Sequence, residues 1–245
     1  MRRAVAARAR RTIAINIAQQ PLFALVRFFH RYPDPHPRSR ELLARWMWRG
    51  ALMGAHTGTT VQTRQMLAAI GDDEHSSVQA LLGTLPPFSP EQRWEALEIE
   101  GYSFGYARCK IQLLALLELN PVDVRTGAPV FDSTILAEVS PFEGSIRSLF
   151  RDSPDPLGSL AKVMFHPSVP TGLVQAVTTC EVPAWLECHA ISDEARRALK
   201  FGKSAEFLAL RASALTEVVS GFAARRGQWD EADTPPVEAL RVASV

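Results

Sequence analysis

The chain has 245 residues, of which 47% are hydrophobic and 22% charged, and its formal net charge at pH 7 is +1. A chain of this size suits one or two packed domains, and it contains no run of about 20 apolar residues that would predict a membrane-spanning helix. Three cysteines at no repeating interval exclude a disulfide scaffold and fit a reducing compartment, so we expect a cytoplasmic protein without a membrane partner.

The first 31 residues contain seven arginines and no acidic residue, which leaves the rest of the chain with a formal net charge of −6. Such an opening is found in transit peptides, in nucleic-acid-binding arms and in helices whose arginines face solvent or an acidic neighbour. We favour the helix, because Ile13, Ile15 and Ile17 lead into the following structure without a linker. If the opening binds nucleic acid, the contacts would come from Arg2, Arg3, Arg8, Arg10 and Arg11.

Residues 2–20 are predicted to be helical, with an interruption near Pro21, which suits a first helical turn. Residues 21–32 then form a short helix with apolar residues around most of its circumference. Because one face cannot bury them all, we expect this helix to be covered on more than one side. If it is not covered, the remaining apolar surface would mark an interface or an aggregation hazard.

Residues 39–54 are predicted to form the central helix around which the chain packs. The prolines of residues 33–37 argue against an earlier start, and Ser39 is a suitable N-cap. Apolar residues recur on one side at helical spacing, so we expect this side to be buried in the core. The stripe consists of Leu42, Trp46, Gly50 and Met53.

Glu41, Arg45 and Arg49 follow one another at four-residue steps on another flank of this helix. Such a row is typical of the polar edge of a core helix. The alternative is that Arg45 and Arg49 contact phosphate or nucleic acid. Trp48 lies about 200° from Trp46 around the helix axis, so the helix is expected to be covered on both sides.

The remaining chain is predicted to contain short helices and one strand pair. An alternation of apolar and polar residues around Thr126-Gly127 predicts a small β-hairpin near residues 122–130. Capping residues, glycines and prolines mark the ends of the helices. The helices are expected at residues 60–70, 73–82, 90–99, 109–119, 132–139, 156–165, 193–201 and 204–226.

The sequence therefore predicts an all-α fold, a multi-helix bundle of one or two packed lobes with at most one small β-hairpin. We place an N-terminal helical lobe around the Trp46 helix at residues 1–83. A C-terminal helical lobe occupies residues 84–245 and ends in a flexible tail from about residue 228.

No motif for phosphate binding or covalent catalysis occurs in the chain. It lacks Gly-x-x-x-x-Gly-Lys, Gly-x-Gly-x-x-Gly and Gly-x-Ser-x-Gly. A zinc site would have to use His166, Cys180, Cys188 and His189, but the two cysteines are not spaced two to four residues apart as in structural zinc sites. We therefore expect no catalytic residue, no metal and no cofactor.

Several stretches resemble the GmrSD-type restriction proteins of prokaryotes. LVRFFHRYPDPHPRSRELLARWMWRGALMG is similar to the stretch that leads into the Trp-x-Trp helix of that family. ALLELNPVDVRTGAPV, LAKVMFHP and LECHAISDEARRALKFGKSAEFLALRASALTEVVSGF look like the helical part that follows. The resemblance runs from about Leu22 to the tail and rests on diffuse helical motifs.

The family begins with a ParB/sulfiredoxin-like nucleotidase domain that carries an Asp-Gly-Gln-Gln-Arg motif, which this sequence lacks. Some members end in an HNH-type nuclease half with a His-x-x-Pro motif. His166 is followed by Pro-Ser-Val-Pro and His189 by Ala-Ile-Ser, so neither histidine matches. The resemblance therefore transfers no catalytic residue to this chain.

What the resemblance implies is a non-catalytic helical module of a prokaryotic restriction or phage-defence protein, which supports or regulates a nucleotidase domain or subunit. The alternative is a nucleic-acid-binding helical module that uses the basic N-terminus, with DNA as its partner. A third interpretation is an enzyme whose site is assembled from scattered His, Cys and Asp residues. Homo-oligomerisation is compatible with each of the three.

Overall fold

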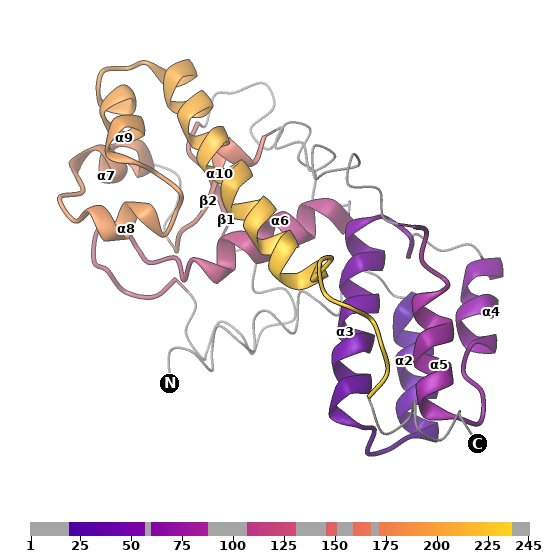
Figure 1. The fold of residues 1–245 in the computed structure, drawn as a ribbon. Helices are drawn as coiled ribbons and strands as arrows, with labels where there is room; N and C mark the ends of the chain where they lie inside the picture. Colours follow the sequence, from indigo (N-terminus) through magenta and orange to yellow (C-terminus); the bar gives the residue numbers. More distant parts are fainter. Residues whose placement is uncertain are drawn as a thin grey trace. The chain divides into compact units, whose positions relative to one another are not determined.

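The computed structural model describes residues 20–56, 60–87, 107–130, 146–150, 159–167 and 172–236. The chain divides into two compact units (Figure 1). Unit 1 comprises Met1–Ala14 and Trp94–Phe222, and unit 2 comprises Ile15–Arg93 and Ala223–Val245. Unit 2 therefore combines residues near the start of the chain with residues at its end.

Helices dominate the described residues, and the predicted all-α class with one small β element is confirmed. A two-stranded antiparallel sheet is formed by β1 (Ile146–Ser148) and β2 (Val163–Phe165). The segment predicted as a hairpin makes a tight turn closed by an isolated antiparallel bridge between Val122 and Pro129. The predicted helices at 90–99 and 132–139 lie outside the described residues, as does the helix predicted at 2–20 except for its last residue, Gln20.

In unit 2, α2 packs against α4 and α3 packs against α5. The α5 helix begins where Asp73 accepts a hydrogen bond from the Ser76 amide at 2.7 Å, and it ends at Gly83. The shared core consists of Ala24, Phe28, Leu42, Leu43, Trp46, Met66, Ile70, Val78 and Leu81. The bounds are α2 (Gln20–Arg31), α3 (Pro37–Leu52), α4 (Thr60–Ala68) and α5 (Glu74–Leu82).

The α3 helix begins two residues earlier than predicted. Pro37 occupies the first turn, where its missing N–H would have no helical partner in any case. His36 is the N-cap residue, and its Nδ1 accepts a hydrogen bond from the Arg38 amide at 3.1 Å. Ser39 is instead buried, with its Oγ 3.2 Å from His75 Nδ1.

Trp46 is fully buried, as predicted from the stripe of α3. Its Nε1 donates to Thr84 Oγ1 at 3.3 Å. The His56 ring packs edge-on against the indole, with ring centroids 4.9 Å apart, and it also lies against Gly50. A glycine is required there, because a Cβ on Gly50 would overlap the imidazole.

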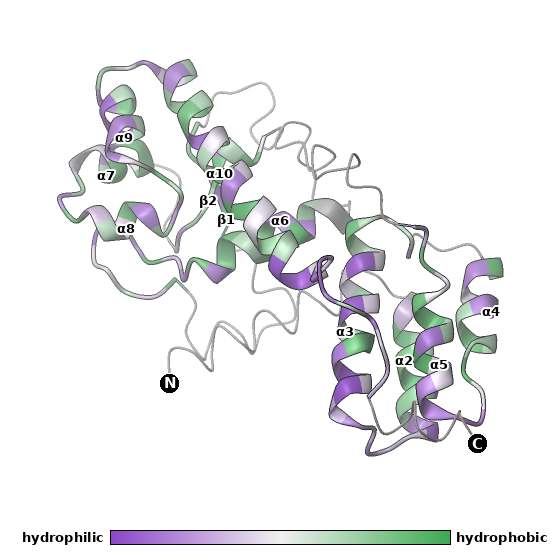
Figure 2. Cartoon of the chain, viewed as in Figure 1, coloured by the Kyte–Doolittle hydropathy of each residue, from purple (hydrophilic) through white to green (hydrophobic). Residues whose placement is uncertain are grey.

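The prediction that α2 is covered on more than one side is wrong. Ala24 and Phe28 are buried against the core of unit 2. Phe23, Val26 and Phe29 retain 61%, 70% and 42% exposure. Green, the colour of hydrophobic residues, covers much of α2 in Figure 2, although the last turn of the helix carries His30 and Arg31. One apolar face of α2 is therefore turned to solvent.

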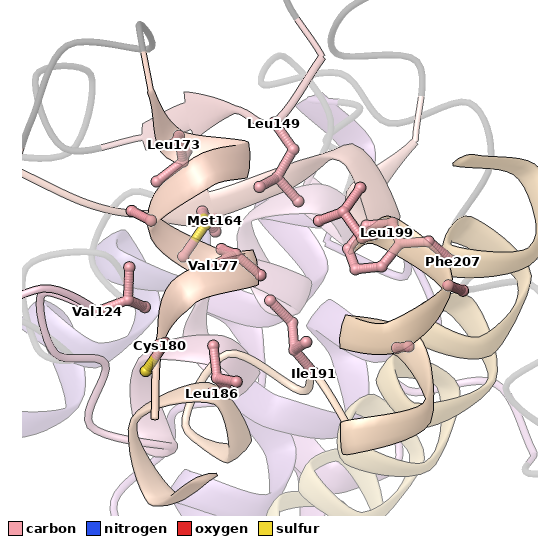
Figure 3. Close-up of a cluster of buried hydrophobic side chains, with 13 residues drawn as sticks. Val124, Leu149, Met164, Leu173, Val177, Cys180, Leu186, Ile191, Leu199 and Phe207 are labelled. Atoms are coloured by element: carbon pink, nitrogen blue, oxygen red, sulfur yellow. The ribbon is translucent and has the colours of Figure 1, made fainter. Parts of the chain in front are cut away.

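In unit 1, the small sheet and several helices enclose a second hydrophobic core (Figure 3). Val177, Leu186 and Ile191 lie at its centre, and Phe207 from α10 packs against them. The helices of this unit are α6 (Ala107–Glu118), α7 (Leu173–Thr179), α8 (Pro183–Glu187), α9 (Asp193–Lys200) and the part of α10 (Ser204–Gly227) that ends at Phe222.

The predicted helix at residues 156–165 is wrong. Ser159 caps a single 3-10 turn, η3 (Leu160–Lys162), and the chain then continues directly into β2. Val163 and Phe165 are β-branched and aromatic, residue types that suit a strand. They pair with β1 in the register Ile146 to Phe165 and Ser148 to Val163.

By length and composition, α10 is the one described helix that could cross a membrane. One third of its most apolar stretch is buried inside the protein. Buried residues follow one another along it at four-residue steps, and one of them is an arginine: Phe207, Arg211, Leu215 and Val219. A core helix of a water-soluble protein has the same pattern, so the finding is weak evidence for a membrane.

Candidate functional site

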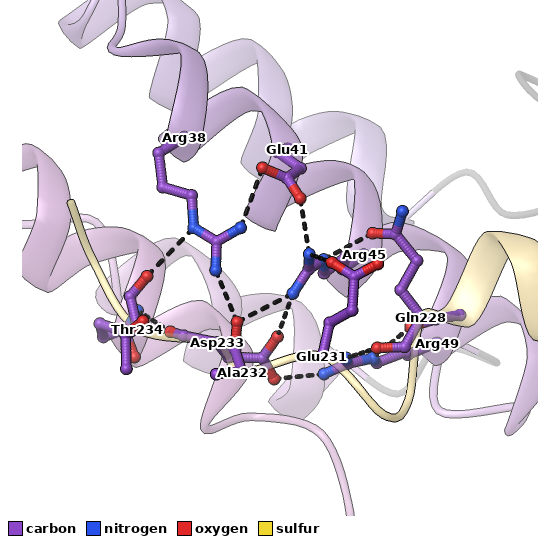
Figure 4. Close-up of polar contacts among 11 residues, drawn as sticks. Arg38, Glu41, Arg45, Arg49, Gln228, Glu231, Ala232, Asp233 and Thr234 are labelled. Atoms are coloured by element: carbon purple, nitrogen blue, oxygen red, sulfur yellow. Dashed lines mark hydrogen bonds and ion pairs between the residues drawn. The ribbon is translucent and has the colours of Figure 1, made fainter.

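The most extensive polar arrangement among the described residues joins α3 to the segment that follows α10. We call residues 228–236 the C-terminal strap. The strap lies along α3 within unit 2 (Figures 1 and 4), although it belongs to the stretch predicted as a flexible tail. Its contacts come from α3 and α5, through Arg38, Arg45, Arg49 and Gln79, which we call the arginine site.

Arg45 is 1% exposed and lies at the centre of this arrangement. Glu41, Arg45 and Arg49 are four residues apart, so they lie on the same face of α3. This face is the one that the strap covers. The guanidinium contacts Glu41 Oε1 at 2.5 Å, Gln228 Oε1 at 2.6 Å, the Ala232 carbonyl at 3.0 Å, Asp233 Oδ1 at 3.2 Å and the Glu231 carboxylate.

Arg49 holds the beginning of the strap, one helical turn further along α3. Its Nε donates to the Gly227 carbonyl and its Nη2 to the Gln228 carbonyl, both at 2.7 Å. Its Nη1 contacts the Asp233 carboxylate. The guanidinium also lies 5.0 Å from the centre of the Trp229 ring, within the range of a cation–π interaction.

Arg38 and Gln79 hold the end of the strap. Arg38 donates to the Ala232 carbonyl at 2.5 Å and to the Thr234 carbonyl at 3.1 Å. Gln79 Nε2 donates to the Asp233 carbonyl at 2.7 Å. The hydrogen bond from Arg38 and the charges of Arg38 and Arg45 lower the pKa of Glu41, although burial opposes them.

The site balances three arginines against the three carboxylates of Glu41, Glu231 and Asp233. Arg45 and Arg49, the two residues of α3 proposed to contact nucleic acid, point into this arrangement, as Figure 4 shows. Both are buried by it, so a phosphate could reach them only after the strap had left. The other proposed contacts, Arg2, Arg3, Arg8, Arg10 and Arg11, lie outside the described residues.

A second polar group lies inside unit 1, around the turn at Val122 and Asp123. His189 Nε2 is 2.7 Å from the Val122 carbonyl, and His166 Nε2 is 3.2 Å from Asp123 Oδ1. Burial lowers the pKa of His189 to about 3 and also lowers the pKa of His166. Both shifts favour the neutral imidazole, and both rings are buried in the core of unit 1.

The candidates for a zinc site do not combine into one. Within the described ranges, no three His, Cys, Asp or Glu side chains are grouped so as to hold a metal ion. Burial raises the pKa of the Cys188 thiol, so it is a poor nucleophile at neutral pH. Its Sγ lies 3.1 Å from the Trp185 carbonyl, and Cys180 is buried in the core of unit 1.

Arg211 is a structurally important residue that the sequence did not single out. It is fully buried, and burial lowers its pKa to about 9. Its guanidinium donates to the carbonyls of Ala161 at 2.6 Å, Val163 at 2.7 Å and His189 at 3.2 Å. Arg211 lies four residues after Phe207 and four before Leu215, so its position on the buried stripe was the available signal.

Comparison of the chain with family models, with curated proteins and with solved structures finds no match.

Proposed function

We propose that this chain is a non-catalytic helical module that binds a partner protein through α2, and that the partner is the nucleotidase domain or subunit of a prokaryotic restriction or defence system. The nature of the partner rests on the resemblance to GmrSD-type proteins. The binding role rests on the apolar face of α2.

The exposed face of α2 is the observation that carries the proposal. Of the six large hydrophobic side chains that are exposed among the described residues, Phe23, Val26 and Phe29 lie on this one helix. A fourth, Val61, is on α4, which packs against α2. Exposed apolar side chains that gather on one element mark interaction surfaces more often than scattered ones do.

The charges around this face favour a partner with carboxylates at its edge. The α2 helix contains no acidic residue, and Arg27 and His30 are exposed beside the apolar side chains. Complementary charge at the rim of an interface speeds association and sets its orientation. An apolar surface with an acidic edge on the nucleotidase domain would therefore match α2.

Co-expression tests the proposal directly. The full chain is produced with a domain from the same genome that carries the Asp-Gly-Gln-Gln-Arg motif. We expect the two proteins to copurify, and Val26→Asp combined with Phe29→Asp to abolish copurification. Phe201→Asp is the matched control, because Phe201 is 75% exposed but lies in unit 1.

The chain purified alone gives a second readout. We expect it to self-associate or to bind a hydrophobic dye, and the nucleotidase domain to suppress both. A monomer that binds no dye and shows a metal-dependent nuclease activity lost on His189→Ala would overturn the proposal.

A further inference from the structure

We infer that the arginine site is a binding site for extended acidic peptides, which the C-terminal strap occupies within the chain and which an acidic segment of another protein can occupy in its place. The inference concerns α3 and α5 and does not depend on the proposed role of α2. It rests on three features: the type of contacts, the ion pairs that hold the strap beyond Trp229, and the turn from which the strap leaves α10.

Of the hydrogen bonds that the arginine site donates to the strap, five go to carbonyls and four go to side chains, and one more goes to the carbonyl of Gly227 at the end of α10. Arg38, Arg45, Arg49 and Gln79 donate to the carbonyls of five residues. Such contacts require an extended chain but not a particular side chain. The five carbonyls belong to Gly227, Gln228, Ala232, Asp233 and Thr234.

Two acidic side chains of the strap are the reason why we expect the arginine site to select acidic peptides. Glu231 contacts Arg45, and Asp233 contacts both Arg45 and Arg49. The two carboxylates are two residues apart in the chain. A peptide with acidic residues at this spacing can therefore replace the ion pairs that the strap makes, whereas a neutral peptide would leave two buried arginines without carboxylates from the peptide.

After Trp229, the apolar residues of the strap are Ala232, which is exposed, and Pro235 and Pro236, which are half-buried. The carboxylate-bearing side chains of Glu231 and Asp233 remain 55% and 32% exposed. Residues 234–236 are Thr-Pro-Pro, and a proline has no N–H to donate. Charge and hydrogen bonds hold this end of the strap, so salt and competing anions should weaken it.

The strap leaves α10 at a defined turn. Gly227 ends the helix, and Gln228 adopts a positive φ of 46°, which is uncommon for a residue with a side chain. The Trp229 ring packs where Gly227 has no Cβ. A tether this short keeps the strap near the arginine site at an effective concentration of about millimolar, so a separate peptide competes poorly with the intact strap.

Fluorescence anisotropy with a labelled peptide tests the inference. The probe is the nonapeptide Gln-Trp-Asp-Glu-Ala-Asp-Thr-Pro-Pro, and the protein is the full chain with Glu231→Gln and Asp233→Asn, which weaken its own strap. We expect this variant to bind the peptide at least about tenfold more tightly than the unmodified chain. Binding should be lost when the peptide carries the same two substitutions, and it should fall at about 0.5 M salt.

Asp230→Asn is the matched control variant, because Asp230 belongs to the strap but is exposed and has no counterpart in the arginine site. It should bind the peptide as weakly as the unmodified chain. Asp233→Asn alone replaces the double variant if the latter does not fold, as judged by circular dichroism. Val26→Asp with Phe29→Asp should not alter peptide binding, which separates this test from the test of the proposed function.

Two results would overturn the inference. One is a folded strap variant that binds neither peptide, or binds the acidic and neutral peptides equally. The other is a strap variant that ignores the peptide but binds a single-stranded oligonucleotide, which would assign the arginine site to phosphate.

Discussion

The imidazole of His56 lies directly against Gly50 of α3. It fills the space that a Cβ would occupy if position 50 held any residue other than glycine. The ring is buried there between the helix backbone and the indole of Trp46. A mid-helix glycine normally costs about 1 kcal/mol relative to alanine. At this position a Cβ would overlap the His56 ring, so we expect the packing of His56 to outweigh that cost.

The substitution Gly50→Ala should therefore destabilise unit 2, in spite of the better helix propensity of alanine. The added methyl group overlaps the His56 ring, and we expect a loss of about 1–3 kcal/mol, as for overpacked cores. Urea denaturation measures the change. Gly83→Ala is the control, because Gly83 has a negative φ and ordinary contacts around its Cβ position, and it should change stability by less than about 0.5 kcal/mol.

Replacing Trp46 tests the central role of α3. Trp46→Ala removes a fully buried indole and its hydrogen bond to Thr84, so we expect a loss of about 3–5 kcal/mol in the free energy of unfolding. Trp48 is only partly buried and stacks with Arg226, so Trp48→Ala should cost less. A denaturation midpoint that barely moves for Trp46→Ala would contradict the core role of the helix.

The stability of the protein should fall in mild acid, partly because of His56. Burial lowers the pKa of His56 to about 4 from an ordinary value of 6.5, so the unfolded chain binds a proton between these values that the folded chain does not. Stability from this group is complete above pH 6.5 and is lost as the pH falls toward 4. At pH 5 the expected loss is about 2 kcal/mol.

Urea denaturation at pH 7 and pH 5 measures this effect. His189 acts in the same direction, because burial lowers its pKa to about 3. His56→Gln should therefore reduce the difference between the two pH values without removing it. An unchanged difference would show that His56 takes up its proton over the same pH range in the folded and the unfolded protein.

Arg211 should be among the least replaceable residues of unit 1. Arg211→Met fills much of the same volume but leaves the carbonyls of Ala161 and Val163 without its donors, so we expect a loss of about 3–5 kcal/mol. Arg211→Lys retains the charge but has fewer donors. The stability of this variant should therefore lie between that of Arg211→Met and that of the unmodified protein. Thermal unfolding followed by circular dichroism measures both. Equal stability for Met and Arg would show that the three hydrogen bonds contribute nothing net.

The arginines at the N-terminus give the remaining test of nucleic-acid binding. If Arg2, Arg3, Arg8, Arg10 and Arg11 contacted DNA phosphates, the log–log dependence of affinity on salt would have a slope near about −4 to −5. We expect a shallower slope for the full chain, because we interpret the opening as part of a helix. Replacement of all five arginines with glutamine is the comparison, and a steep slope that these substitutions abolish would favour the DNA-binding alternative.

The features that the sequence predicted depend on neighbours within one or two helical turns. The stripe that contains Trp46 and the glycine that follows the helix predicted at residues 73–82 are local signals, and the corresponding helices were found. The start of α3 was misplaced because Pro37 was treated as a barrier when it is suited to the first turn. The strand after Ser159 was missed because three residues are too few to show a period of two.

The arginine site could be predicted only in part. The four-residue steps from Glu41 to Arg45 and Arg49 identified a polar edge of α3. Nothing in these three residues indicates that the C-terminal strap packs against them. Asp233 lies 184 residues beyond Arg49, in a stretch without apolar periodicity that was therefore expected to be a tail. Long-range ion pairs leave no local pattern in a sequence, and the same is true of the carbonyl contacts of Arg211.

The position of the strap at the far end of the chain determines when unit 2 can be completed. The ribosome makes α3 early, but the residues that cover Arg45 and Arg49 come after the whole of unit 1 from Trp94 onward. At about 5–20 residues per second, the two arginines wait on the order of 10–40 seconds for Asp233. During each round of synthesis, the positively charged side chains of Arg45 and Arg49 are therefore exposed until the strap has been made and covers them.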